Sequence, residues 1–108
     1  MIVVDSSALI AILRREPEAD DFLRIMANAD RCLLSSVTWL ETSMVLAGLA
    51  GDASSWTEFD ALIVRAGIEV VALDAGLAEA ARTAFLRYGK CRHPAALNLG
   101  DCASYALA

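Results

Sequence analysis

Short apolar runs alternate with longer amphipathic stretches along this chain. The runs at residues 2–5, 32–35 and 68–73 are too short for helices and are bounded by polar residues, which predicts three buried strands. The stretches between and after them predict helices over residues 8–13, 17–28, 36–50, 55–66, 74–88 and 99–108. Strands that alternate with helices in this way are typical of a parallel sheet covered on both faces. We therefore expect one three-layer α/β/α sandwich over residues 1–108.

Residues typical of helix ends stand at the predicted boundaries. Gly51 and Gly67 are expected to end two helices, and residues 89–97 are expected to form a loop. Side chains suited to capping precede the helices: Ser6 or Ser7, Ser36, Ser55 with Glu58, Asp74 and Asn98. Two apolar stripes are expected to face inward: Val37, Leu40, Met44, Val45 and Leu49 in one helix, and Leu77, Ala80, Ala81, Ala84, Phe85 and Tyr88 in another. Trp39 and Trp56 are expected in the core or an interface.

The composition is that of a folded domain, and its high hydropathy raises the question of a membrane. Hydrophobic residues make up 57% of the chain, and the mean hydropathy is +0.50. The most apolar window, residues 32–51, carries one charge but five Ser or Thr residues, so a buried strand followed by a helix explains it. The first apolar run is halted by Asp5 and is too short for a signal peptide. Three cysteines without a pairing pattern argue against a disulfide framework or a zinc site. We expect a cytoplasmic protein that contacts no membrane.

The net charge of −5 is unevenly distributed. Residues 1–79 hold five basic and thirteen acidic residues, whereas residues 80–108 hold four basic residues and one acidic residue. The acidic whole argues against indiscriminate binding of nucleic acid. The local basic stretch could still contact a phosphate-bearing partner, or could be a solvated helix end and loop: Arg82, Arg87, Lys90 and Arg92.

Three carboxylates are predicted to meet at one edge of the sheet. Asp5 ends the first strand, Glu41 lies early in the helix after the second strand, and Asp101 lies in the first turn of the last helix. Each alone has an ordinary explanation as a cap or a solvated acid, but the three together at one edge are less easily explained. Apolar neighbours leave Glu41 and Asp101 little access to the surface. Carboxylates that converge repel one another, and a hard divalent cation, Mg²⁺ or Mn²⁺, removes that repulsion.

Two further residues are candidates of lower weight. Ser7 is expected to be a helix cap first and a site hydroxyl second. His93, next to a proline, is expected to be an ordinary loop residue rather than a catalytic base.

Three segments together resemble PIN domains of the VapC toxin type. They are Val3-Val4-Asp5-Ser6-Ser7-Ala8-Leu9, Ser35-x-x-Thr38-x-x-Glu41, and the segment from His93 to Cys102 that ends in Gly100-Asp101-Cys102. The resemblance covers the whole chain, and it implies that Asp5, Glu41 and Asp101 bind Mg²⁺ or Mn²⁺ and that Ser7 supplies a hydroxyl near them. It further implies an endoribonuclease, the toxin of a type II toxin–antitoxin pair in a bacterial cytoplasm, which forms a homodimer and is blocked by an antitoxin.

The end of the chain also gives rise to an expectation. The last apolar helix has no capping signal, and three strands make a narrow sheet. We expect the native domain to continue with about 20 residues that include another strand, at typical element lengths. In the family, a fourth acidic residue lies in such a segment. The apolar residues of the helices over 16–28 and 36–66 are expected to form a groove for an antitoxin helix.

Other functions have weaker support. A phospho-acceptor signalling domain needs a second acidic residue and a lysine near the C-terminus, and a dehalogenase-type phosphatase needs Asp-x-Asp at the first strand, where residue 7 is serine. The stronger alternative is a non-catalytic PIN-like module that only binds a protein partner.

Overall fold

A computed structural model describes residues 1–88 and 98–108. Lys90, Arg92 and His93, with the loop expected over residues 89–97, lie outside these residues. The described elements, in chain order, are β1 (Ile2–Val3), α1 (Ser6–Leu13), α2 (Ala19–Asn28), β2 (Cys32–Ser35), α3 (Ser36–Ala50), α4 (Trp56–Arg65), β3 (Ile68–Val71), α5 (Ala75–Tyr88) and α6 (Leu99–Leu107).

The three strands form a parallel sheet in the order β1-β2-β3. Ile2 pairs with Cys32, and Cys32 pairs in turn with Ile68. Hydrogen bonding continues past β1, since the backbone N–H of Val4 donates to the Leu33 carbonyl at 2.8 Å. The carboxyl ends of the strands therefore share one edge of the sheet, as the alternation of elements predicts.

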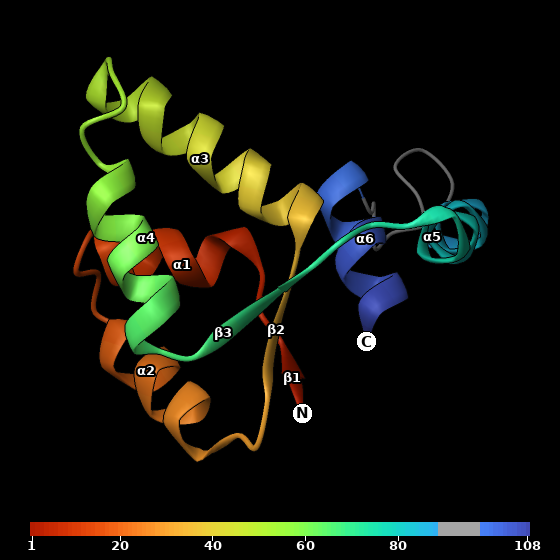
Figure 1. The fold of residues 1–108 in the computed structure, drawn as a ribbon, viewed down its shortest axis with the longest axis horizontal. Helices are drawn as coiled ribbons and strands as arrows, with labels where there is room; N and C mark the ends of the chain where they lie inside the picture. Colours follow the sequence, from red (N-terminus) through yellow and green to blue (C-terminus); the bar gives the residue numbers. More distant parts are fainter. Residues whose placement is uncertain (89–97) are drawn as a thin grey trace.

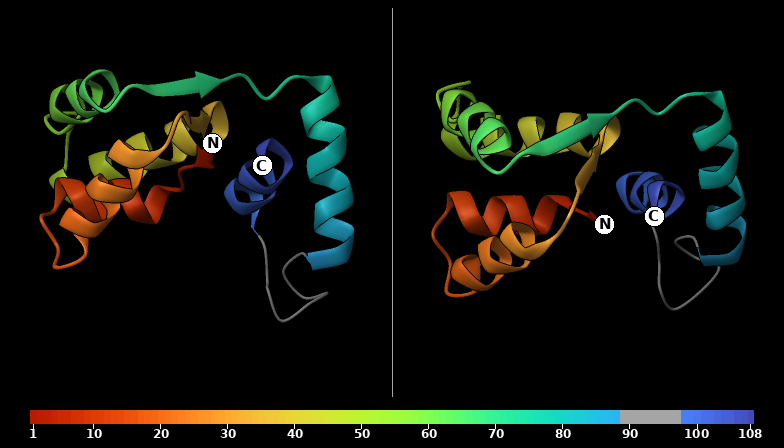
Figure 2. Two further views of the ribbon diagram at one scale, coloured as in Figure 1. Left: turned by 90° about the horizontal axis from the view of Figure 1, so that it is seen from below. Right: turned by 60° about the horizontal axis from the view of Figure 1, so that its bottom comes forward.

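Helices cover both faces of the sheet. Figure 1 shows α1 to α4 on one side of the strands and α5 and α6 on the other. Both views in Figure 2 place α6 between α5 and the rest of the molecule. The three-layer α/β/α prediction is confirmed; on this face α6 packs on the sheet, and α5 packs on the outside of α6.

The main core lies between the sheet and helices α1 to α4. Phe59 of α4, Leu9 of α1 and Leu34 of β2 are completely buried there. Because side chains alternate along a strand, Leu33 faces the other side, where Cys102 and Ala103 of α6 are also buried.

Helix α3 buries a different face from the one its apolar pattern predicts. Thr38, Thr42, Ser43 and Leu46 are buried, whereas most of the predicted apolar stripe is exposed: Leu40, Met44, Val45 and Leu49 are 44–63% exposed. The buried hydroxyls are satisfied locally, since Thr42 Oγ1 donates to the carbonyl of Thr38 at 2.7 Å and Ser43 Oγ to that of Trp39 at 2.9 Å. Satisfied hydroxyls can be buried at little cost, which leaves the apolar side of α3 on the surface.

Part of the predicted inward stripe of α5 is wrong as well. Ala80 and Phe85 of α5 are exposed, because this helix packs mainly on α6 and covers little else. Trp39 and Trp56 are 37% and 42% exposed, and the Trp56 indole N–H donates to the carbonyl of Ser43 at 2.9 Å. Both rings therefore lie at the surface rather than in the core, and their place in an interface stays a prediction.

Several predicted caps are replaced by neighbouring residues. Asp5, rather than Ser6 or Ser7, caps α1, and Ser35, rather than Ser36, caps α3. The Ser55 side chain makes no capping hydrogen bond. Asp74 and Asn98 cap as predicted, with hydrogen bonds of 2.8 and 3.0 Å to the backbone N–H groups of Leu77 and Asp101.

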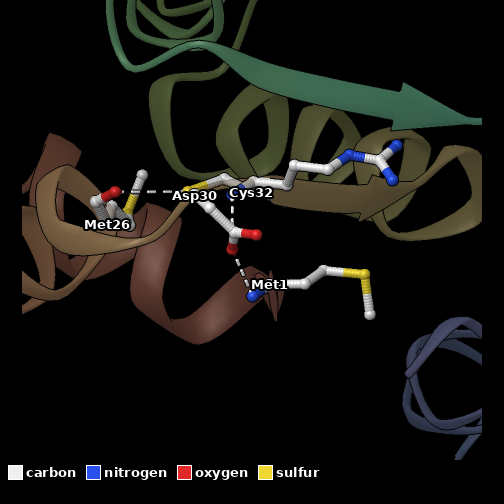
Figure 3. Close-up of polar contacts among 5 residues, drawn as sticks. Met1, Met26, Asp30 and Cys32 are labelled. Carbon is white, nitrogen blue, oxygen red and sulfur yellow. Dashed lines mark hydrogen bonds and ion pairs between the residues drawn. The ribbon is translucent and has the colours of Figure 1, made fainter.

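The amino ends of the strands are held by charged groups (Figure 3). Asp30 Oδ1 accepts hydrogen bonds from the N-terminal ammonium of Met1 and from the backbone N–H of Arg31. The hydrogen bond and positive charge of that ammonium lower the pKa of Asp30. Nearby, the thiol of Cys32 donates to the Met26 carbonyl at 3.4 Å, and burial raises its pKa. These contacts lie at the amino edge of the sheet, and the predicted carboxylates lie at the opposite, carboxyl edge.

Within the described residues, no helix is both long enough and apolar enough to cross a membrane.

Candidate active site

The three predicted carboxylates line one small cavity at the carboxyl edge of the sheet. Its volume is about 30 Å³, which is enough for a single water molecule or ion but not for a nucleobase. Its lining is almost entirely polar: Asp5, Ser6, Thr38, Glu41, Asn98, Gly100, Asp101 and Ser104. Segments from the start, the middle and the end of the chain are thus brought to one point.

Asp5 is placed by the turn from β1 into α1. Its Oδ1 accepts hydrogen bonds from the backbone N–H of Ala8 at 3.0 Å and from the Ser7 hydroxyl at 2.8 Å. Within the described part of the chain, Oδ2 accepts none. One oxygen of Asp5 therefore caps the helix, and the other is available to the cavity.

Ser7 supports Asp5 rather than forming the cavity wall. Its hydroxyl donates to Asp5, while the adjacent Ser6 lines the cavity. The sequence pattern favours Ser7 because it stands two residues after the aspartate.

Glu41 lies on α3, where that helix passes α6. Its side chain is half-buried, and its carboxylate lies against Gly100. Asp101 follows Gly100 and takes part in a reciprocal cap of α6, in which its Oδ2 accepts from the backbone N–H of Asn98 at 3.2 Å. Asp5 and Asp101 are exposed, so the expectation that apolar neighbours keep the site away from the surface is wrong for Asp101.

Two hydroxyl residues that sequence reasoning did not select complete the wall. Thr38 Oγ1 and Ser104 Oγ form a hydrogen bond of 3.2 Å that joins α3 to α6 beside the cavity. Thr38 precedes Glu41 by three residues and Ser104 follows Asp101 by three, so helical spacing places each pair on one face. That spacing is the signal that could have found them.

The donor atoms of the site suit a hard cation, but its carboxylates are not gathered into a preformed metal-binding cluster. All of its side-chain donors are oxygens of carboxylates, hydroxyls and an amide, the ligands that Mg²⁺ and Mn²⁺ prefer. Across residues 1–88 and 98–108, however, no three His, Cys, Asp or Glu side chains stand together as a metal-binding group. The carboxylates share a cavity, and one oxygen each of Asp5 and Asp101 is engaged in a helix cap.

The described basic candidates lie on the helix that packs against α6. Arg82 and Arg87 are both exposed on α5, and α5 makes its most extensive contacts with α6, which carries Asp101. Tyr88 and Tyr105 contact each other between the two helices, with ring centroids 5.5 Å apart. The thiol of Cys102, next to Asp101, is buried, and burial is the main cause that raises its pKa.

Comparison with known proteins places this arrangement in a family. The model of the PIN domain matches residues 2–108. This chain belongs to the PIN-domain family. A Ribonuclease VapC of Mycolicibacterium smegmatis is 45% identical to this PIN domain over 107 residues, which are 99% of this chain and 82% of that protein. Ribonucleases VapC30 and VapC28 of Mycobacterium tuberculosis are each 42% identical, over 81% and 80% of their length. The resemblance of this PIN domain to the VapC type is thereby confirmed.

Proposed function

We propose that this PIN domain is a divalent-cation-dependent endoribonuclease and acts as the toxin of a toxin–antitoxin pair in a bacterial cytoplasm. The observation that carries the proposal is the single small polar cavity that Asp5, Glu41 and Asp101 share at the carboxyl edge of the sheet. Relatives that are 42–45% identical are named ribonucleases, which supports RNA as the substrate.

The three carboxylates would hold one Mg²⁺ or Mn²⁺ ion. When bound, the ion supplies an activated water and offsets the charge of the phosphodiester. Asp5 contributes the oxygen that its capping role leaves available. Thr38 and Ser104, whose hydroxyls are hydrogen-bonded to each other, line the same cavity from two helices. A fourth carboxylate, expected from the resemblance, stays a prediction.

RNA would approach over α5 and α6. Three carboxylates alone repel a polyanion, so the substrate needs the cation and positive charge outside the cavity. Arg82 and Arg87 provide such charge on exposed positions of α5. We propose that they contact phosphates along the RNA backbone, as Lys90 and Arg92 would also do.

Incubation with total cellular RNA tests the proposed activity. The protein should produce discrete internal cuts with Mg²⁺ or Mn²⁺ and none with EDTA, and mapping of the cut ends gives the preferred site. Glu41→Gln should abolish cleavage, whereas Glu58→Gln, the same change at an exposed position of α4, should leave it intact. Cleavage that persists in EDTA or in Glu41→Gln would contradict the proposal.

The groove between α1, α2 and α4 is the proposed antitoxin site. Its volume is about 520 Å³, and its lining is mainly apolar: Ile12, Leu23, Met26, Ala27, Leu62, Arg65 and Ala66. An amphipathic helix could place its apolar side chains there. Leu23→Asp should weaken binding of the protein encoded next to this one at least tenfold, and Leu86→Asp, at an exposed position of α5, should not. Equal affinities would refute this site. Partner binding without any cation-dependent cleavage would favour the non-catalytic module.

The proposed contact between two copies of the chain is made by the exposed apolar side chains of α3: Leu40, Met44, Val45 and Leu49. These side chains are 44–63% exposed, and exposed apolar patches of this kind mark protein–protein contacts. Sedimentation should show a dimer for the wild type and a monomer for Met44→Glu. A wild-type monomer at micromolar concentration would contradict the dimer.

A further inference from the structure

Gly100 of α6 lies against the Glu41 carboxylate. It is buried in the first turn of the helix. A methyl group built on its Cα would lie 2.9 Å from the Glu41 carboxylate carbon and 3.0 Å from its Oε1, and it would overlap Oε2. These distances are too short for real contacts, so no side chain fits at residue 100 while Glu41 keeps its place.

The two helices are also tied one turn away from this contact. The hydrogen bond between Thr38 and Ser104 joins α3 three residues before Glu41 to α6 four residues after Gly100. From the first contact to the second, the residue number falls along α3 and rises along α6, so the two helices are antiparallel here. Together the two contacts fix the position of α6 on α3. The collision at residue 100 could be relieved by sliding α6 only if this hydrogen bond were broken.

The colliding atoms are the end of a flexible side chain rather than backbone. A larger residue at position 100 would push the Glu41 carboxylate aside and leave the helices in place. Helix propensity alone favours alanine here, since glycine lowers the stability of a helix. The use of glycine is explained by the space that the carboxylate takes.

We infer that Gly100 is a positioning residue, whose missing side chain lets the Glu41 carboxylate lie over the first turn of α6, next to Asp101 and facing the cavity. The consequence for cation binding rests on the proposed function, whereas the consequence for the position of Glu41 does not.

Gly100→Ala tests the inference against a matched control. Gly48→Ala makes the same change within α3 at a position where an added methyl meets nothing within 4 Å. The first readout is the side-chain carboxyl ¹³C resonance of Glu41 in the cation-free protein, assigned by its absence in Glu41→Gln. We expect it to shift in Gly100→Ala and to stay in place in Gly48→Ala. An unmoved resonance in Gly100→Ala would overturn the inference.

The second readout is the affinity for Mn²⁺, measured by titration with detection of the free ion. Mutation of a residue that orients a metal ligand typically costs 10–100-fold in metal affinity, and we expect a loss of this size in Gly100→Ala only. Adding Glu41→Asp, which shortens the side chain by one methylene, should restore part of that loss. Unchanged affinity, or no restoration, would overturn the cation-binding part. A wild type that binds no Mn²⁺ would instead contradict the proposed function and leave the resonance test standing.

The melting temperature separates this role from simple packing. In the Glu41→Ala background the collision is gone, so Gly100→Ala should raise the melting temperature as Gly48→Ala does. A lowered melting temperature in that background would show that residue 100 is small for the sake of backbone packing, and would overturn the inference.

Discussion

Asp5 has two roles that can be separated by the choice of substitution. Its Oδ1 caps α1 by accepting from the Ala8 N–H, and we propose that its Oδ2 binds the cation. Asparagine keeps an oxygen for the cap but replaces the second oxygen with an N–H donor group that carries no charge. Alanine removes both oxygens.

The expected effects on stability follow from the capping role. Asparagine and aspartate are about equally good N-caps, so Asp5→Asn should change the free energy of unfolding by less than about 0.5 kcal/mol. Loss of a capping side chain costs about 1 kcal/mol, so Asp5→Ala should lower it by that amount. In a domain of 108 residues this corresponds to a fall in melting temperature of about 4 °C.

The assay pairs thermal unfolding with cation-dependent RNA cleavage for the two variants. Both should lose cleavage, whereas only Asp5→Ala should lose stability. Cleavage at the wild-type rate by Asp5→Asn would show that Asp5 is a helix cap and nothing more. A large loss of stability in Asp5→Asn would show that the carboxylate charge itself holds the fold.

Three other predictions concern the core, the acid sensitivity and the RNA contact. Phe59 is completely buried, so Phe59→Ala should lower the free energy of unfolding by about 3–5 kcal/mol in urea titrations; a loss below 1 kcal/mol would contradict the described core. The pKa of Asp30 is lowered in the folded protein by its contact with the N-terminal ammonium. The contact therefore stabilises the fold at pH values above the pKa that Asp30 has in the unfolded chain, and this stabilisation is lost as the pH falls through the lower pKa of the folded state. Asp30→Asn should therefore melt below the wild type at neutral pH, with a gap that closes on acidification; a gap independent of pH would refute this. Arg87→Ala should weaken RNA binding and reduce the slope of log affinity against log salt by about 0.7, and an unchanged slope would remove Arg87 from the RNA contact.

The layout of the fold could be predicted because it depends on local patterns. Buried strands such as 32–35 are short apolar runs, and Gly51 adopts the left-handed conformation, at φ 80°, that ends α3 where predicted. The alternation of strands and helices then places the carboxyl ends of parallel strands together. This is why the sequence alone predicts that Asp5 and Glu41 lie at one edge.

The faces of the helices could not be predicted in the same way. Thr42 is buried because its hydroxyl donates to the Thr38 carbonyl, and Thr38 because its hydroxyl is hydrogen-bonded to Ser104 of α6. No local pattern of the sequence records these contacts, which leave the apolar side of α3 outward. The contact between Glu41 and Gly100 likewise joins residues 59 positions apart. Such contacts depend on how α6 packs against α3, and the hydropathy pattern does not encode the packing of one helix against another.

Binding of Mn²⁺ to the metal-free protein tests the central claim, that Asp5, Glu41 and Asp101 form one cation site, most directly. A calorimetric titration should show one ion bound per chain, and each of Asp5→Asn, Glu41→Gln and Asp101→Asn should weaken that binding at least tenfold while Glu58→Gln leaves it unchanged. Binding that survives any one of the three site substitutions at wild-type affinity would show that this carboxylate does not belong to the site.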